Sequence, residues 1–588
     1  MSSLRTGTFV ALMWPVLQAV ERGQLCPPMG HAYWGTGESV LLSSVVGGDR
    51  LGRSLRALGD LDGDGTEEVL VGAPATGPGG VGGGSFRVFS VRQAPSPEPG
   101  TLAHAWTFGP PQGSSVQAGD GFATSAANLG DPDGDGSIEI ALGSPGEDGG
   151  AGALYVLTID VLPTGPDPFD ISLVRRIGAG DEDLDGVLEA GDRFGEAVAA
   201  IGDLNGDLVG DLVVGAPGCD DGGQDRGAVW VLFLAPGGAI AGSQKISAST
   251  VAVPGLDVDG AFGSALAKLG PPSGAGDLNQ DGLPDIAVGA PAAAGGGAAW
   301  VLFLGHDGVP LAAKRVPENA GDFADSTGGP GELGSALACL GPDPANPDQV
   351  ILAVGAPGTQ DWTVGQGGYW NLSLGPDGSC LESMRVSATR GGFSGFLERA
   401  SRFGSALATG PDLDDNGLPD LFVGAPGTGA DGSEEGAAWA VFTSEEFVAR
   451  VEPFGESGGL AHGPPAVLVI EDDPVPGGAC NATLDWPDAP PGEAGTVCLY
   501  VSWKPHDLAP EGALLPGYTG NLLVPHTQST VYHESGWTAA GGPIQIATTI
   551  PLEASLLGTS LFVQGGIHLE DGVMLSNGLR LVLGLQTE

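Results

Sequence analysis

One pattern recurs six times along the 588 residues of this chain. Each unit opens with an aromatic residue or Leu followed by a small residue, and successive openings are 71, 72, 68, 71 and 70 residues apart. A Gly-Ala-Pro or Gly-Ser-Pro mark follows about twenty residues later in every unit. Two marks that stay in phase through six copies identify a repeat architecture. The openings are Leu51-Gly52, Phe122-Ala123, Phe194-Gly195, Phe262-Gly263, Leu333-Gly334 and Phe403-Gly404, and the second marks begin at Gly72, Gly143, Gly215, Gly289, Gly355 and Gly424.

Each unit is expected to form four strands. A run of small apolar residues follows the opening, and a polar loop leads to a β-branched run that ends at the second mark. A third strand such as 227–233 and a more variable fourth strand complete the unit. Four strands repeated radially are typical of a β-propeller, whose innermost strands leave room only for small side chains. A linear array of sandwiches would need long Pro-rich linkers between units, and the sequence has none.

The number of blades follows from the number of units. Six units favour six blades, and the alternative is a degenerate seventh blade after Ser444. Rings of this kind usually close by borrowing one strand from the other end of the chain. Residues 38–46 precede the first unit, and we expect them to be the outer strand of the last blade, which begins at Phe403.

Five of the six units place alternating oxygen side chains between the two marks. Numbered from the first Asp, these side chains occupy positions 1, 3, 5 and 9, Gly occupies position 6 in four of the five loops, and position 7 can offer its backbone carbonyl. Hard oxygen ligands in this number suit Ca²⁺ better than zinc or a transition metal. The predicted ligands are Asp60, Asp62, Asp64, Thr66 and Glu68 in unit one; Asp131, Asp133, Asp135, Ser137 and Glu139 in unit two; Asp203, Asn205, Asp207, Val209 and Asp211 in unit three; Asp277, Asn279, Asp281, Leu283 and Asp285 in unit four; and Asp412, Asp414, Asn416, Leu418 and Asp420 in unit six.

These loops differ from EF-hands, which need a bidentate Glu at position 12. Here position 12 is Val or Leu within the second strand, so the ion is expected to hold the first strand against the second. Solvated Asp/Asn/Gly turns are the alternative, but five in-phase copies favour about five Ca²⁺ ions. Unit three has Leu208 in place of Gly, and unit five (342–348) has lost the spacing. The acidic run 181–192 is either a further site or a solvated loop.

The two marks and the Asp-rich loop between them resemble the repeats of the integrin α-subunit propeller and its bacterial relatives, over roughly residues 36–450. The resemblance implies an all-β propeller with four-stranded antiparallel blades, although integrin propellers have seven. It also implies a calcium-binding, secreted or cell-surface adhesion or interaction module, with an unknown protein or polysaccharide ligand at one propeller face. A structural envelope scaffold and a glycan-active enzyme are the alternatives. The sequence has no P-loop or His-Glu-x-x-His motif, so we expect no catalytic site.

The net charge of the chain excludes one class of binding partner. The chain has 22 Lys and Arg against 72 Asp and Glu, which gives a net charge of −50. Such a surface repels phosphate backbones, so nucleic acid is excluded as a partner. Hydrophobic residues make up 41% of the chain, which is enough for a core and excludes a disordered protein.

The rest of the chain divides into a leader and a C-terminal domain. Residues 1–25 carry Arg5 and an apolar stretch, which predicts a signal peptide; a buried first strand or a wrongly chosen start codon is the alternative. No later stretch is long and apolar enough to span a membrane. We expect the propeller at 28–455 and a β-sandwich at 460–588. The cysteines do not have the Cys-x-x-Cys spacing of a zinc site. Cys480 and Cys498 could form a disulfide, but the sequence alone does not decide whether they pair.

Overall fold

The computed structural model describes two separate units of the chain. It describes residues 50–443 with their side chains, except 76–82, 93–101, 133, 163–167, 237, 250–252, 254, 271–275, 317–330, 345, 361–364, 389–392, 394–396, 398 and 429–435. Outside this range it describes only the backbone pairing of strand β1 and strands β25–β33. In the described part of the chain, no helix has the length and apolar character needed to cross a membrane.

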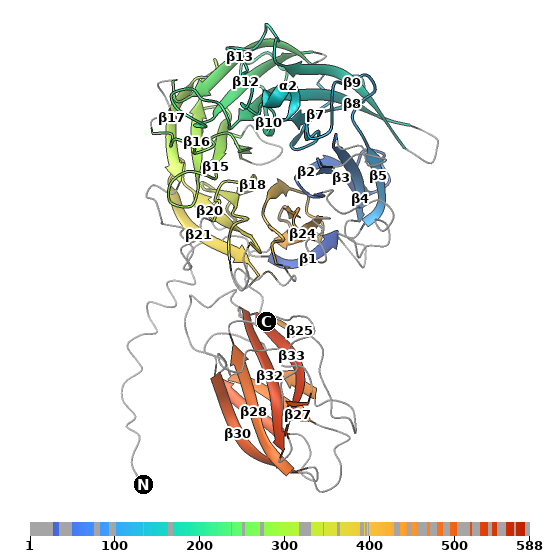
Figure 1. The fold of residues 1–588 in the computed structure, drawn as a ribbon, viewed down its shortest axis with the longest axis vertical. Helices are drawn as coiled ribbons and strands as arrows, with labels where there is room; N and C mark the ends of the chain where they lie inside the picture. The colour runs from blue at the N-terminus through green and yellow to red at the C-terminus, as the bar shows by residue number, and fades with distance from the viewer. Residues whose placement is uncertain are drawn as a thin grey trace. The chain divides into compact units, whose positions relative to one another are not determined.

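The first unit is a ring of six antiparallel four-stranded sheets (Figure 1). The innermost strand of each blade contacts the innermost strands of both neighbouring blades, so β2, β6, β10, β14, β18 and β22 form a closed cycle. The all-β propeller with six blades is therefore confirmed. A short helical segment, α2 (Glu147–Gly150), follows the second strand of blade two. The strands of blades one to three are β2 (Ser54–Gly59), β3 (Thr66–Ala73), β4 (Ser85–Arg92) and β5 (Leu102–Phe108); β6 (Ala126–Gly130), β7 (Ile138–Ser144), β8 (Ala153–Val161) and β9 (Phe169–Gly178); and β10 (Ala197–Gly202), β11 (Asp211–Ala216), β12 (Ala228–Ala235) and β13 (Ala239–Ser247).

The sixth blade closes the ring with a strand from the N-terminal side. The strands of blades four to six are β14 (Ala265–Leu269), β15 (Asp285–Ala290), β16 (Ala298–Leu304) and β17 (Pro310–Val316); β18 (Leu337–Pro342), β19 (Val350–Gly355), β20 (Gly368–Leu374) and β21 (Cys380–Ser387); and β22 (Ala406–Thr409), β23 (Leu421–Ala425), β24 (Ala437–Thr443) and β1 (Pro28–Trp34). The expectation of an N-terminal closing strand is correct, but its position is wrong. The strand that pairs with β24 is Pro28–Trp34, whereas residues 38–46 lie outside the described residues.

Neighbouring blades contact each other through the two sequence marks. The opening mark of one blade packs against the second mark of the preceding blade. The opening residue of a unit forms a parallel bridge with the glycine that precedes the third strand of the preceding blade, as in Phe262 with Gly227. The small residue after it lies against the glycine of the preceding blade's second mark. A Cβ on Gly215 would stand 1.9 Å from the carbonyl oxygen of Gly263. The same contact recurs around the ring, including Gly424 against Gly52 at the closure.

Replacing Gly215 by Ala is expected to destabilise the propeller by about 3 kcal/mol, because the added methyl group would meet a backbone carbonyl that only a shift of a whole blade can move. The midpoint of denaturant unfolding measures this change. Gly242→Ala in the same blade is the matched control, because a Cβ there meets only the Phe233 side chain at 3.8 Å. Equal unfolding midpoints for the two variants would contradict the assignment of these glycines to the blade contacts.

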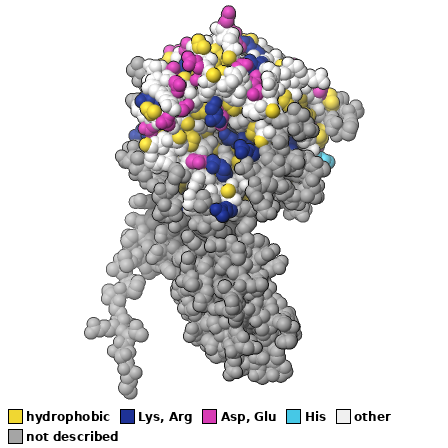
Figure 2. Space-filling view, viewed as in Figure 1, with side chains coloured by type: hydrophobic (Ala, Val, Ile, Leu, Met, Phe, Trp, Pro, Cys, Tyr) yellow, Lys and Arg dark blue, Asp and Glu magenta, His cyan; other side chains and the backbone are white. Residues whose placement is uncertain are grey.

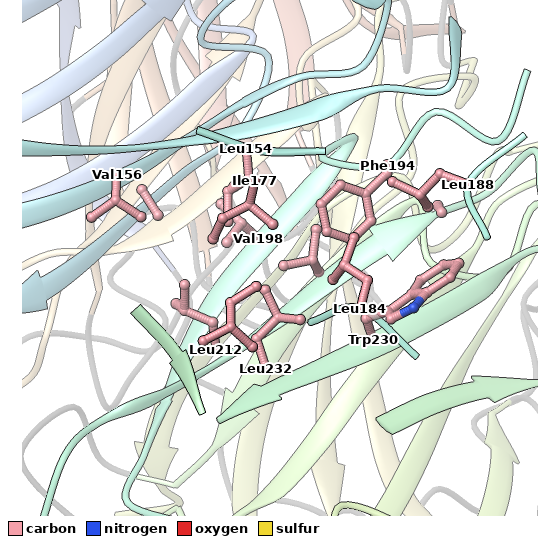
Figure 3. Close-up of a cluster of buried hydrophobic side chains, with 14 of the residues drawn as sticks. Leu154, Val156, Ile177, Leu184, Leu188, Phe194, Val198, Leu212, Trp230 and Leu232 are labelled. Carbon is pink, nitrogen blue, oxygen red and sulfur yellow. The ribbon is translucent and has the colours of Figure 1, made fainter. Parts of the chain in front are cut away.

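The hydrophobic core lies between neighbouring blades. In the cluster of Figure 3, Leu154 and Val156 of blade two pack with Phe194, Leu212 and Trp230 of blade three. The rings of Phe194 and Trp230 meet edge to face, with centroids 5.6 Å apart. Another cluster joins blade one to blade six through residues such as Leu51 and Phe422. The apolar surface of each blade is therefore buried by the next one, which makes a closed ring the stable arrangement.

The second unit contains residues 444–588 and is described by its backbone alone. One sheet has the order β25-β33-β32-β28-β30 with β29 paired to β33, and a second has the order β26-β27-β31. The predicted sandwich and the Cys480–Cys498 disulfide stay predictions, because they depend on packing and side chains outside this description. The strands are β25 (Arg450–Phe454), β26 (Val467–Ile470), β27 (Ala479–Asp485), β28 (Ala494–Ser502), β29 (Tyr518–Thr519), β30 (Thr530–Thr538), β31 (Ile544–Thr549), β32 (Ser560–Leu569) and β33 (Gly572–Val582).

Candidate metal centres

The five acidic loops connect the first strand to the second strand in blades one, two, three, four and six. In each loop the carboxylate at position 1 accepts hydrogen bonds from the loop backbone. In blade three, Asp203 Oδ1 accepts from the N–H groups of Gly206 at 2.6 Å and Asp207 at 3.1 Å, and Oδ2 accepts from Leu208 at 2.8 Å. The loop is thus wrapped around its own first carboxylate. Equivalent bonds are made by Asp60, Asp131, Asp277 and Asp412.

The acid at position 9 lies at the beginning of the second strand, or directly before it in blade six, and it is buried. Asp420 Oδ2 accepts from the N–H of Leu413 at 2.8 Å, and its Oδ1 accepts from the N–H of Thr443 at 2.9 Å. Asp211 makes the equivalent bonds to Leu204 and Leu234. In blades three and six this side chain therefore ties the loop and the third strand to the beginning of the second strand. The alternation of acids in the sequence predicts a metal ligand at position 9, but it does not reveal that this carboxylate also accepts backbone hydrogen bonds.

Burial disfavours the charged form of these acids. Desolvation, with smaller contributions from the other loop carboxylates, raises the pKa of Asp420 to about 8. The same causes raise the pKa of Asp285 and of Glu68 to about 7, and the pKa of Asp211 to about 6. A divalent cation beside these groups favours the deprotonated form. The loops therefore hold carboxylates in positions where a bound cation would compensate their charge.

Among the described residues, three carboxylates converge in blade one and in blade six. Ligand oxygens of Asp60, Asp62 and Glu68 lie within 4.8 Å of one another. The same holds for Asp412, Asp414 and Asp420, which occupy the same positions 1, 3 and 9.

The donor set in blade six fits a hard cation. Asp414 Oδ1 is buried and has no hydrogen-bond partner. A buried carboxylate oxygen without a partner is costly unless a cation or water binds it. Carboxylates at this separation match the many-oxygen coordination of Ca²⁺. Asp412, Asp414 and Asp420, with Asn416 beside them, would hold the ion in blade six.

The other three loops share the backbone geometry but gather fewer carboxylates among the described residues. In blades three and four position 3 is an amide, and the Nδ2 groups of Asn205 and Asn279 donate to Asp207 and Asp281 at 3.0 and 2.9 Å. In blade two, Asp133 lies outside the described residues. That these three loops bind calcium, and that the carbonyl at position 7 is a ligand in any loop, stay predictions.

Two positions in each loop need a left-handed backbone, and the sequence pattern revealed only one of them. Position 6 has φ between +72° and +94° in all five loops, where four have Gly and blade three has Leu208. Position 4 is also left-handed, and two loops have a non-glycine residue there, Gln280 and Asp415. The loop conformation is thus maintained in blade three although Leu208 is unfavourable there.

Leu208→Gly is expected to stabilise the protein by about 1 kcal/mol, because it relieves a left-handed conformation at a side chain that is 91% exposed. Thermal unfolding at saturating calcium measures the gain. The reverse change at the equivalent position of blade four, Gly282→Leu, is the matched control and should cost a similar amount, since no atom lies within 4 Å of an added Cβ. A decrease in stability of Leu208→Gly would show that the leucine makes a favourable contact.

Blade five and the 181–192 run use their acids in other ways. In blade five, the Ser373 hydroxyl donates to Gln349 Oε1 at 2.5 Å and lies 3.4 Å from Asp343 Oδ2, so protein hydrogen bonds occupy the place of the loop site. In the outer run, Arg175 binds both Asp181 and Asp183. In the described part of the chain neither segment brings three carboxylates together as blades one and six do.

Comparison with known proteins agrees with the propeller fold. The family model described as "FG-GAP repeat" matches residues 52–89, 194–232, 273–302 and 403–441, which belong to blades one, three, four and six. The chain contains an integrin-α-like FG-GAP propeller. Each matched segment begins at or near an opening mark or within an acidic loop, and ends in the third strand of its blade.

The relatives are much longer proteins. Integrin alpha-PS2 of Drosophila melanogaster is 31% identical over 255 residues, which are 42% of this chain and 16% of that protein. Integrin alpha-IIb of Mus musculus is 38% identical over 170 residues, covering 28% of this chain and 15% of that protein. Phosphatidylinositol-glycan-specific phospholipase D of Mus musculus is 38% identical over 112 residues, covering 18% of this chain and 12% of that protein. The chain thus matches less than a fifth of each relative.

Proposed function

We propose that this protein is a calcium-stabilised interaction module that acts outside the cytoplasm, secreted or at a cell surface. The similarity of its propeller to the repeats of proteins named integrin alpha supports an adhesive role. The observation that carries the calcium part of the proposal is the convergence of Asp412, Asp414 and Asp420 in blade six, where a buried carboxylate oxygen lacks a partner.

Calcium has a structural role in this proposal. Each ion would join the first and second strands of one blade, and in blades three and six the position-9 acid extends that link to the third strand. The ion takes part in no reaction. It keeps the blades in a fixed order around the axis, so that the loops at both propeller faces hold their positions for a ligand.

A glycan and protein array, probed with the full chain in calcium and after chelation, tests the interaction role. Selective, calcium-dependent binding to a protein or polysaccharide supports the proposal, and binding to nothing on the array favours a structural scaffold. One similar protein is named as a phospholipase, so release of product from chromogenic glycosides or phosphodiesters would identify an enzyme instead.

The N-terminus of the native protein, measured by mass spectrometry, tests export. Cleavage near residue 25 supports export, and an intact Met1 opposes it.

A further inference from the structure

The propeller face opposite the acidic loops contains a concave site rich in arginine. Inner strands begin at this face and end at the loops, so the site lies on the ring axis at the start of the strands. The cavity has a volume of about 790 Å³ and is lined by residues of blades one, three, four, five and six. A second cavity of about 640 Å³ continues it over blade two. We call the four arginines that line the larger cavity the arginine funnel: Arg50, Arg53, Arg193 and Arg402. The first three of them also line the second cavity.

The funnel is positive in a strongly negative protein. The chain has only 22 Lys and Arg against 72 Asp and Glu, yet four arginines lie in this one cavity with two acids, Glu196 and Glu332. One more acid, Asp120, lines the extension over blade two. Figure 2 shows basic side chains gathered near the middle of one propeller face. The chain has a net charge of −50, so a local excess of positive charge suggests that this cavity has a specific role.

Three of the four arginines occupy a backbone position that is unfavourable for a long side chain. Three of these arginines stand directly before the opening mark of their unit, where every unit has a left-handed backbone: φ is +55° at Arg50, +62° at Arg193 and +55° at Arg402. Unit two has Gly121 there, which is the residue that fits this conformation. Long side chains in left-handed positions cost free energy, and such residues concentrate at functional sites. The propeller geometry requires the conformation but does not require the arginine.

The funnel already binds carboxylates of the protein itself. Glu196 accepts from Arg53 through Oε1 and from Arg193 through Oε2, both at 2.7 Å, and Arg402 donates to Glu332 at 2.6 Å. The side chains of Arg193 and Arg402 are still 54% and 47% exposed. A guanidinium group has five N–H donors, and each of these three ion pairs is made through the Nη2 group of its arginine. All four arginines line the cavity of about 790 Å³, which is large enough for several side chains.

We propose that the arginine funnel binds an acidic peptide segment of a partner protein through its Asp or Glu side chains. The arginines are distributed over blades one, three and six with glutamates among them, so they suit single negative charges spaced along a chain better than one compact phosphate. Guanidinium groups pair with carboxylates in a planar, bidentate geometry. The proposal rests on the proposed function, because it assigns the binding face and the ligand class of the interaction module.

The test uses the full chain in calcium and a fluorescein-labelled peptide of ten glutamates, with binding followed by fluorescence anisotropy. The double variant Arg193→Gly/Arg402→Gly should bind at least about tenfold more weakly, because it removes two charge-assisted contacts. It should fold at least as well as the wild type, because glycine relieves both left-handed positions and Glu196 keeps Arg53 as its partner. Its melting temperature is measured alongside.

The matched control is Glu332→Gly, which relieves the same backbone position with φ of +54° but removes a negative charge. It should bind the peptide as tightly as the wild type or more tightly. Equal affinity of the double variant and the wild type, or equal binding of a ten-glutamine peptide, would overturn the proposal. Inorganic phosphate that competes as well as free glutamate peptide would also overturn it, in favour of a small-oxyanion site. A ligand found on the array that the peptide does not displace leaves the interaction role intact and refutes only the funnel as its site.

Discussion

Chelation of calcium is expected to lower the melting temperature of the propeller by many degrees. A ligand that binds only the folded state stabilises it by about 2.7 kcal/mol per site at a hundredfold excess over Kd, and five loops have the backbone geometry of a site. Removal of the ions also leaves clustered carboxylates such as Asp60, Asp62 and Glu68 to repel one another. Differential scanning calorimetry in calcium and after chelation measures the shift, and equilibrium dialysis counts the ions.

Single-loop variants separate the sites. Asp414→Asn should remove about one ion and give a smaller shift than full chelation, because it affects one blade of the ring. Asp348→Asn in blade five is the matched control and should leave the ion count unchanged, because hydrogen bonds from Ser373 replace the loop site there. A protein that binds no calcium, or one that loses an ion in the blade five variant, would contradict the assignment of the loops.

The ion-free protein is expected to become less stable as the pH rises from about 5 to about 8, which is the reverse of the usual behaviour of proteins with paired carboxylates. Burial raises the pKa of Asp420 to about 8 and that of Asp285 to about 7, whereas carboxyl groups of the unfolded chain titrate near 4. The folded state therefore binds more protons than the unfolded state in this range. Its stability is largest below the unfolded pKa and is lost as the pH rises through the folded pKa.

Saturating calcium should reverse the sign, because the ion binds the deprotonated carboxylates. Melting temperatures measured at several pH values, in calcium-depleted and in calcium-containing buffers, give both slopes. Asp420→Asn is the informative variant, since it removes the group with the highest of these pKa values and should flatten the ion-free profile. A melting temperature that increases with pH in calcium-depleted buffer would show that the buried acids are charged without the ion.

The sequence predicted the blades because their requirements are local and repeated. Glycines such as Gly215 and Gly263 recur because the carbonyl of one blade leaves no room for a Cβ on the next, and this constraint is the same at each contact of the ring. The acidic side chains of the loops could also be predicted from the sequence, because alternate residues of such a loop point toward one centre. The closing strand was misplaced because an outer strand pairs along one edge only, so β1 carries little of the pattern that marks a central strand.

The arginine funnel could not be predicted from residue types. The position before each opening mark holds Arg, Gly, Arg, Ala, Glu and Arg in the six units, which shows no shared chemistry. What these residues share is a left-handed backbone next to the axis, and only the folded ring brings Arg50, Arg193 and Arg402 to one cavity. The raised pKa of Asp420 likewise arises from burial, which the acidic pattern alone does not reveal.

The closure of the ring sets the order in which this protein can fold. Blade six combines β1 from the beginning of the propeller segment with β22, β23 and β24 from its end, and Leu51 bridges Gly436. Contacts between residues so distant in sequence form slowly, and the last blade has no complete set of strands until residue 443 has been synthesised. Until then β1 has no β24 to pair with, and its edge is open to pairing with other chains. The risk of misassembly is therefore greatest during synthesis and ends when the ring closes.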